Sequence, residues 1–257
     1  MALYNYPYPS YTWGFQGVDF AYIPVTQELA YQMYEDGIRF VGRYLYADRY
    51  PNGKGISAQE LQYYLTAGIR VFFFYEVNTT DALGGYDRGQ TNGLACLTEI
   101  NDLQIPVGTQ IYCCCDTGVS DADASSVVMD YLQGFSDALP DYNCGIYGGT
   151  NVVESCYNTF PLKYRCQAGA WGSQEFEPIN VRQWLIGANR NAERDGYIHI
   201  QNVVIDSNGY ATWRGYNVDL ISADSLENMV GDDSPTPPTP TPTDSDKMPI
   251  WFYLKLF

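Results

Sequence analysis

The sequence predicts an α/β fold, a (β/α)8 TIM-type barrel. Short apolar segments alternate with helix-like segments along the chain, and this order is typical of parallel sheet. The strand-like segments are apolar throughout, as expected for strands covered by helices. About eight such units fit a closed barrel. The alternative is a doubly wound open sheet, which usually has a Gly-rich loop after its first strand, where this chain has VDFAYIP.

Helix and strand signals follow one another in a regular order. We expect strands at residues 15–22, 38–46, 69–77, 107–116, 142–149, 163–171, 180–186, 198–206 and 216–221. We expect helices at residues 26–37, 57–68, 87–103, 121–139, 150–160 and 222–230. Ser57 and Glu60 form a capping-box pattern. The barrel is expected to be irregular in its last third, with hairpin or loop structure at residues 185–220.

Composition divides the chain into three parts. Residues 1–231 have the globular pattern and form the predicted barrel domain. Residues 232–246 form a Pro/Thr-rich linker, which we expect to be extended and solvated. Residues 247–257 (KMPIWFYLKLF) are apolar and predict a docking peptide that adds a strand to a partner or fills a groove. The alternative for these last residues is a disordered, sticky tail.

Charge and composition exclude several classes of function. The net charge of −16 disfavours nucleic acid and other polyanions as partners. No segment has the roughly 20 apolar residues of a transmembrane helix. The first residues lack the basic start and apolar run of a secretory signal. We therefore expect a protein that stays in a host cytoplasm until lysis or that is associated with a virion.

The seven cysteines predict structural burial rather than metal binding. They lack paired CxxC spacings. Adjacent residues of a strand point to opposite faces, so Cys113, Cys114 and Cys115 cannot all bind one ion. Redox chemistry and disulfides are the alternatives. We expect no metal and no cofactor.

Acidic and aromatic residues gather at the ends of the predicted strands, which form the functional face of such a barrel. The catalytic candidates are Asp19, Glu76 and Asp116, because glycoside hydrolysis needs two carboxylates that flank the glycosidic bond. The alternative for any of these acids is a structural ion pair with Arg43. The substrate-binding candidates, most of them aromatic, are Arg43, Tyr44, Tyr46, Tyr75, Tyr112, Tyr147, Trp171, Gln183 and Trp184.

Six short motifs, in this order and spacing, carry a resemblance to a known family. They are GVDFA (17–21), GRYLY (42–46), IYCCCD (111–116), GIYGG (145–149), RQW (182–184) and NVDL (217–220). Over about residues 14–230 the chain resembles the glycoside-hydrolase-like TIM-barrel family of bacterial secreted proteins and phage lysins. This family is related to the glycoside hydrolase family 25 muramidases.

The resemblance implies roles for three aspartates. Asp19 corresponds to a first-strand aspartate, and Asp116 to the first acid of the fourth-strand motif. Asp219 corresponds to a late aspartate that is structural or positions substrate, and it joins the substrate-binding candidates. Muramidases have a proton-donating glutamate two residues after the fourth-strand acid, where this chain has Gly118. Glu76, next to Tyr75, is the candidate replacement.

The sequence therefore supports two main hypotheses of function. The first is a peptidoglycan- or glycan-directed glycoside hydrolase of the lysozyme or endolysin type, encoded by a phage or associated with a virion. The alternative is a catalytically inactive hydrolase-like barrel that binds carbohydrate or serves as a structural virion protein, docked through residues 247–257. A third hypothesis, an intracellular enzyme for a small metabolite, needs a phosphate site, for which residues 187–196 are the candidate segment.

Overall fold

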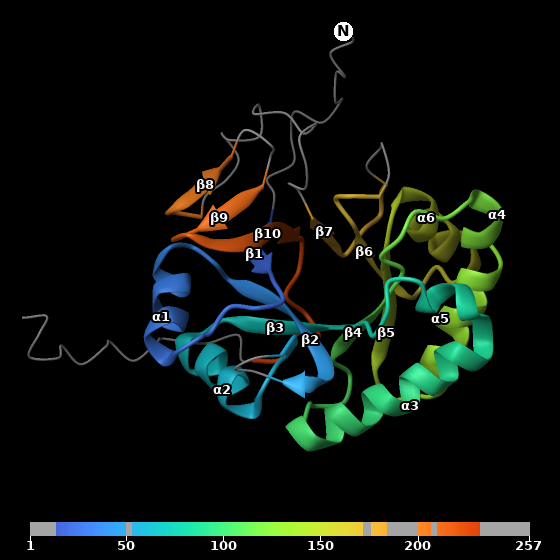
Figure 1. Cartoon of the computed structure of the whole chain (residues 1–257), viewed down its shortest axis with the longest axis horizontal. Helices are drawn as coiled ribbons and strands as arrows, with labels where there is room; N and C mark the ends of the chain where they lie inside the picture. The colour runs from blue at the N-terminus through green and yellow to red at the C-terminus, as the bar shows by residue number, and fades with distance from the viewer. Residues whose placement is uncertain (1–13, 50–52, 172–175, 184–199, 207–209, 232–257) are drawn as a thin grey trace, which may run out of the picture.

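The structure is a computed structural model that describes residues 14–49, 53–171, 176–183, 200–206 and 210–231. Eight strands close into a barrel, which confirms the predicted fold class (Figure 1). In their order around the barrel they are β1 (Phe15–Asp19), β2 (Phe40–Arg49), β3 (Arg70–Tyr75), β4 (Gln110–Cys114), β5 (Asn143–Gly148), β6 (Tyr164–Gln167), β7 (Val181–Gln183) and β10 (Tyr216–Ala223).

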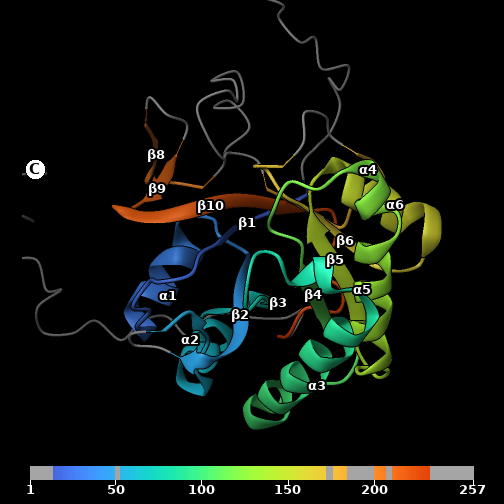
Figure 2. The ribbon, with the colours of Figure 1, turned by 45° about the vertical axis from the view of Figure 1, so that its right-hand side comes forward.

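The last barrel strand runs in the opposite direction to the others. Strands β1 to β7 pair in parallel, whereas β10 pairs antiparallel with both β7 and β1. Two further strands, β8 (Val203–Ile205) and β9 (Ala211–Trp213), extend β10 outside the barrel, as Figures 1 and 2 show. Arg214 and Gly215 form the tight turn from β9 to β10, and both have positive φ, as such hairpins require. The hairpin structure expected in the last third is therefore present.

Helices cover the barrel on two sides (Figure 1). Helices α1 and α2 lie beside the first strands, and the longer helices α3 and α5 pack against each other on the other side. The helices are α1 (Gln27–Glu35), α2 (Ala58–Ala67), α3 (Gly85–Leu103), α4 (Asp121–Ala124), α5 (Val127–Asp137) and α6 (Thr150–Thr159), with a 3-10 turn η1 (Asp81–Gly84) before α3. No described helix has the length and apolar character needed to cross a bilayer.

The predicted helix signals hold in the first half of the chain and fail at two later places. Thr26 and Ser57 cap α1 and α2 by accepting hydrogen bonds from backbone N–H groups, and the left-handed Gly68 ends α2. The single helix predicted at residues 121–139 is two helices, α4 and α5, because Ser125 and Ser126 interrupt it.

The predicted helix at residues 222–230 is wrong, because this segment closes the bottom of the barrel instead. Its backbone bonds go to the starts of β3 and β4. Val71 and Val230 exchange two backbone hydrogen bonds of 3.0 and 2.8 Å, and Asn228 O accepts from the backbone N–H of Gln110 at 2.7 Å. Met229 is buried inside the barrel. Pairing with the strands thus satisfies backbone groups that a helix would have bonded internally.

Two apolar cores lie on the two faces of the barrel wall, because successive strand residues point to opposite sides. The inner core contains Phe72, Tyr112 and Cys114, and the outer core between strands and helices contains Cys113 and Cys115. All seven cysteines are buried and none forms a disulfide. The three consecutive cysteines therefore fill both cores, as the strand pattern predicts.

Candidate active site

Asp19 and Asp219 face each other at the mouth of the barrel. Asp19 is the last residue of β1 and is 2% exposed. Because β10 is antiparallel, its early residue Asp219 lies at this end, and the two aspartates are direct register partners. Residues paired in this way have Cα atoms about 5 Å apart and side chains on the same face. The reversal of one strand therefore places two carboxyl groups side by side.

Asp116 completes a group of three aspartates. It follows β4 by two residues, and the indole Nε1 of Trp171 donates a hydrogen bond of 2.8 Å to its Oδ1. The charge of Asp116 contributes to the raised pKa of both Asp19 and Asp219, so its carboxylate lies near them. Segments that are far apart in the sequence thus bring three acids to one rim.

The environment of the rim favours the protonated form of two of these acids. Burial raises the pKa of Asp219 to about 6, and the nearby charge of Asp116 adds to the effect. Burial also raises the pKa of Asp19 well above its ordinary value, helped by the charge of Asp219 and opposed by a hydrogen bond from Gln183. A carboxyl group whose pKa is raised toward neutral pH is suited to act as a general acid.

Gln183 links Asp19 to the neighbouring strands. Its side-chain oxygen accepts hydrogen bonds from the Tyr147 hydroxyl at 3.0 Å and from the Gly169 backbone N–H at 3.1 Å. These bonds fix the amide orientation, so that Nε2 donates to Asp19 Oδ2 at 2.9 Å. Gln183 and Tyr147, both predicted to bind substrate, therefore lie in contact with the acid group or next to it.

Glu76 lies on the same side of the barrel and has a lysine partner. Its side chain is 9% exposed and forms an ion pair of 2.8 Å with Lys54 Nζ. Lys54 also lies 4.1 Å from the centre of the Tyr44 ring. The pKa of Tyr44 is raised chiefly by burial and also by the charges of Asp19 and Glu76, so this side chain lies near both acids. No sequence pattern predicts a role for Lys54, because a lysine in a loop belongs to no periodic pattern.

Three predicted site residues do not reach the mouth. Arg43 points outward and forms its ion pair with Glu60 of α2 at 2.7 Å, so the capping-box glutamate fastens α2 to the barrel. Tyr75 also points outward and packs against α5. Tyr112 is inside the barrel, but its hydroxyl donates to Gln110 at the start of β4, which is the opposite end. These three side chains therefore do not lie beside Asp19 and Asp116 at the mouth.

Two further candidates complete the set. Tyr46 follows Tyr44 by two residues on β2 and is half-buried. Trp184 lies outside the described residues.

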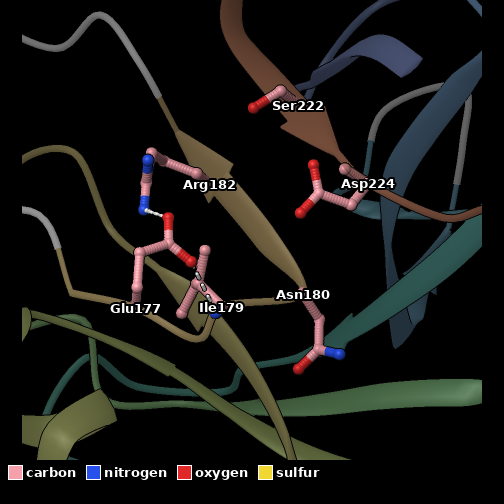
Figure 3. Close-up of a pocket in the computed structure, with 7 residues that line it drawn as sticks. Glu177, Ile179, Asn180, Arg182, Ser222 and Asp224 are labelled. Carbon is pink, nitrogen blue, oxygen red and sulfur yellow. Dashed lines mark hydrogen bonds and ion pairs between the residues drawn. The ribbon is translucent and has the colours of Figure 1, made fainter. Parts of the chain in front are cut away.

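Two pockets of different size lie near the last barrel strand. A hollow of about 750 Å³ opens beside Asp19 and Asp219, and its walls include Tyr22 and Tyr210, which are not among the residues predicted from the sequence. Both tyrosines lie outside the barrel strands, where strand periodicity gives no signal. The other pocket, of about 10 Å³, is too small for a ligand; Figure 3 shows the ion pair of Glu177 with Arg182 there.

The closed barrel with acids at its mouth defines a glycoside-hydrolase-like fold. A family model described as "Rv2525c-like, glycoside hydrolase-like domain" matches residues 31–220, and the chain belongs to this family. The family resemblance noted from the motifs is thereby confirmed. No curated protein sequence matches the chain.

Solved structures share the fold at low sequence identity. The Tat-secreted protein Rv2525c of Mycobacterium tuberculosis, in complex with HEPES, matches with a TM-score of 0.62 and 18% identity, over 83% of this chain and 98% of that one. Its complex with L-tartrate matches with a TM-score of 0.60 and 18% identity, over 81% and 94% of the two chains. A B. stearothermophilus protein matches with a TM-score of 0.55 and 18% identity, over 84% and 100%.

Proposed function

We propose that the protein is a glycoside hydrolase that cleaves a cell-wall glycan, with peptidoglycan as its substrate. The observation that carries this proposal is the group of Asp19, Asp116 and Asp219 at one barrel mouth, where two of the three carboxyl groups have raised pKa values. Membership of a glycoside hydrolase-like family supports the same class of reaction.

The geometry suggests a division of roles between the acids. In our proposal the pair of Asp19 and Asp219 shares a proton and delivers it to the leaving glycosidic oxygen. Asp116, oriented by Trp171, is the carboxylate that attacks the anomeric carbon or activates water. Glu76, ion-paired with Lys54, is the other candidate for the proton donor that muramidases place at the position of Gly118.

Digestion of purified peptidoglycan tests the proposal. We compare the wild type with Asp116→Asn, Asp219→Asn and Glu76→Gln, using Asp130→Asn, at an exposed position of α5, as the matched control. New reducing ends and soluble muropeptides are measured by colorimetry and mass spectrometry. We expect release by the wild type and the control, and a loss of about 100-fold or more in Asp116→Asn and Asp219→Asn. Equal release by all five proteins would overturn the enzymatic role.

A second candidate function is carbohydrate binding without hydrolysis. Gly118, in place of the glutamate of the muramidases, favours it. In this case the wild type and Asp116→Asn would co-sediment equally with insoluble peptidoglycan, and neither would release reducing ends. The same digestion therefore separates the two functions.

The biological setting that we propose is a phage-encoded or virion-associated lysin. The apolar composition of residues 247–257, which lie outside the described residues, supports a docking role toward an assembly protein. A chain truncated after Gly231 should keep its fold and fail to join particles. Full incorporation of the truncated chain would contradict the docking role.

A further inference from the structure

The hollow beside the acids extends away from the barrel toward the hairpin. Its lining comes from the loop after β1, which includes Tyr22, and from β9, β10 and the residues next to them. Its volume of about 750 Å³ is within the range of small-ligand sites. Asp19 and Asp219 form its inner end. A molecule that contacts these acids therefore has room to continue along the hairpin.

Tyrosine rings line this hollow and are open to solvent. Tyr22 is 71% exposed and Tyr210 is 57% exposed. Tyr216, also in the wall, is stacked on Trp213 with ring centres 6.3 Å apart. Exposed aromatic rings offer a flat apolar face and a hydroxyl group, which suits the faces of sugar rings. Their position around a concavity distinguishes them from single exposed apolar residues.

A buried carboxylate holds the hairpin wall in place. Asp36, at the end of α1, accepts hydrogen bonds from Trp213 Nε1 at 2.9 Å, Arg214 Nε at 2.6 Å and Asn202 Nδ2 at 2.9 Å. One side chain thus ties the strand and turn of the hairpin to the helix layer. The wall is preorganised, which reduces the entropy lost when a ligand binds.

The lining carries negative charge. The pair of Asp19 and Asp219, which shares one proton in the proposed function, and Asp206 together leave negative charge in the lining, and among the described residues that line the hollow there is no lysine, arginine or histidine. A sugar with its own carboxylate would be repelled, and a sugar with a free amine would be attracted. We infer that the hollow is a glycan subsite beside the scissile bond that selects a glucosamine unit with a free amino group. This inference rests on the proposed function for the location of the scissile bond.

Binding measurements test the subsite independently of catalysis. Calorimetry is done at pH 7.5 with Asp116→Asn protein and three tetrasaccharides, of glucosamine, N-acetylglucosamine and galacturonic acid. We expect affinity to fall in that order, and the preference for the glucosamine tetramer to weaken as salt is added. Tyr210→Ala should weaken binding of the glucosamine tetramer about tenfold. Asp206→Asn should reduce its advantage over the N-acetylated tetramer about threefold.

The matched control is Tyr86→Ala, an exposed tyrosine on α3 at the other side of the barrel (Figure 1), which should leave binding unchanged. Three outcomes would overturn the subsite, even if the wild type digests peptidoglycan. They are equal affinity for the three tetramers, absence of binding, and unchanged binding in Tyr210→Ala. Selective binding without digestion would remove the proposed hydrolysis and leave the subsite.

Discussion

The inside of the barrel has two layers of opposite chemistry, and the same strands build both. In the lower layer, Phe72 packs edge-on against Phe74 and Tyr112, with ring centres 5.0 and 5.4 Å apart. Asp116 lies at the rim, two residues after Cys114 along the chain. A step of two residues keeps a side chain on the same face, so one face changes from aromatic and thiol groups to carboxylates.

The two layers contribute to stability with opposite signs. The lower layer removes apolar surface from water and stabilises the fold. The rim confines Asp19, Asp116 and Asp219, and the raised pKa values of Asp19 and Asp219 mean that their ionised forms are disfavoured in the folded state. An arrangement that opposes folding is expected where catalysis needs it. The comparison therefore predicts that substitutions in the two layers have opposite effects.

Neutralising a rim acid should have the largest effect. Asp219→Asn removes a rim carboxyl group whose pKa of about 6 suits proton donation, so kcat/KM on peptidoglycan should fall about 10²- to 10⁴-fold. The free energy of unfolding at pH 7 should rise, because an amide is not subject to charge repulsion. Urea denaturation and hydrolysis assays check both effects, with Asp130→Asn as the control. A loss of activity together with a loss of stability would show that the rim is structural.

Truncating the lower layer should have the reverse effect. Phe72→Ala leaves a cavity in the inner core and should lower the free energy of unfolding by about 3–5 kcal/mol. Hydrolysis per folded molecule should change far less than in Asp219→Asn. Leu162→Ala, at a site that is 96% exposed, is the control and should stay within about 0.5 kcal/mol of the wild type. Loss of activity in fully folded Phe72→Ala protein would mean that the layers are not separable.

The raised pKa of Asp219 should make the free energy of unfolding depend on pH. Asp219 has a pKa of about 6 in the folded protein and an ordinary value of 3.8. Between these values the folded state binds more protons than the unfolded state, so stability should fall as pH rises from about 4 to 6. Asp36 has the opposite effect on the pH dependence of stability. Burial raises its pKa, but hydrogen bonds, chiefly from Arg214, lower it by more, so the net pKa lies below the ordinary value. The stability that ionised Asp36 contributes is therefore lost only as pH falls below about 4.

Urea denaturation midpoints measured between pH 4 and 6 give the slope of stability against pH. Asp219→Asn should flatten it between pH 4 and 6, and a slope unchanged by the substitution would assign the effect to other groups.

Restoring the muramidase glutamate should have the smallest effect. A Cβ atom added at Gly118 would make an ordinary contact of 3.8 Å with the Trp171 ring, so the site accepts a side chain. Gly118→Glu should raise the rate of peptidoglycan hydrolysis a few-fold by adding an acid near Asp116, with Gly118→Gln as the uncharged control. Equal rates of hydrolysis in both variants would indicate that a further acid at the rim does not contribute to catalysis.

Much of this comparison follows from the sequence. The apolar strands, the helix caps at Thr26 and Ser57, and the position of Asp19 at a strand end are local properties, which a periodic pattern reports directly. The alternation of faces also explains why three adjacent cysteines have no common role.

The remaining features depend on contacts between distant segments. The sequence did not show that residues 222–230 pair with β3 and β4 instead of forming a helix, because the partner backbone groups lie far away in the chain. The sequence motif predicted Arg43 at the mouth. In β2, however, side chains alternate between the two faces, and Arg43 is on the outer face, where it pairs with Glu60. The hairpin hollow depends on the anchoring by Asp36, which no local pattern reveals.

The most direct test of the central claim is a carboxyl-carbon NMR titration of protein labelled at its aspartate side chains. We expect an aspartate carboxyl signal with a pKa near 6, which should be absent in Asp219→Asn. If every aspartate instead titrated at or below about pH 4, the ordinary range for this side chain, no rim acid would have a raised pKa and the proposed general acid would be contradicted.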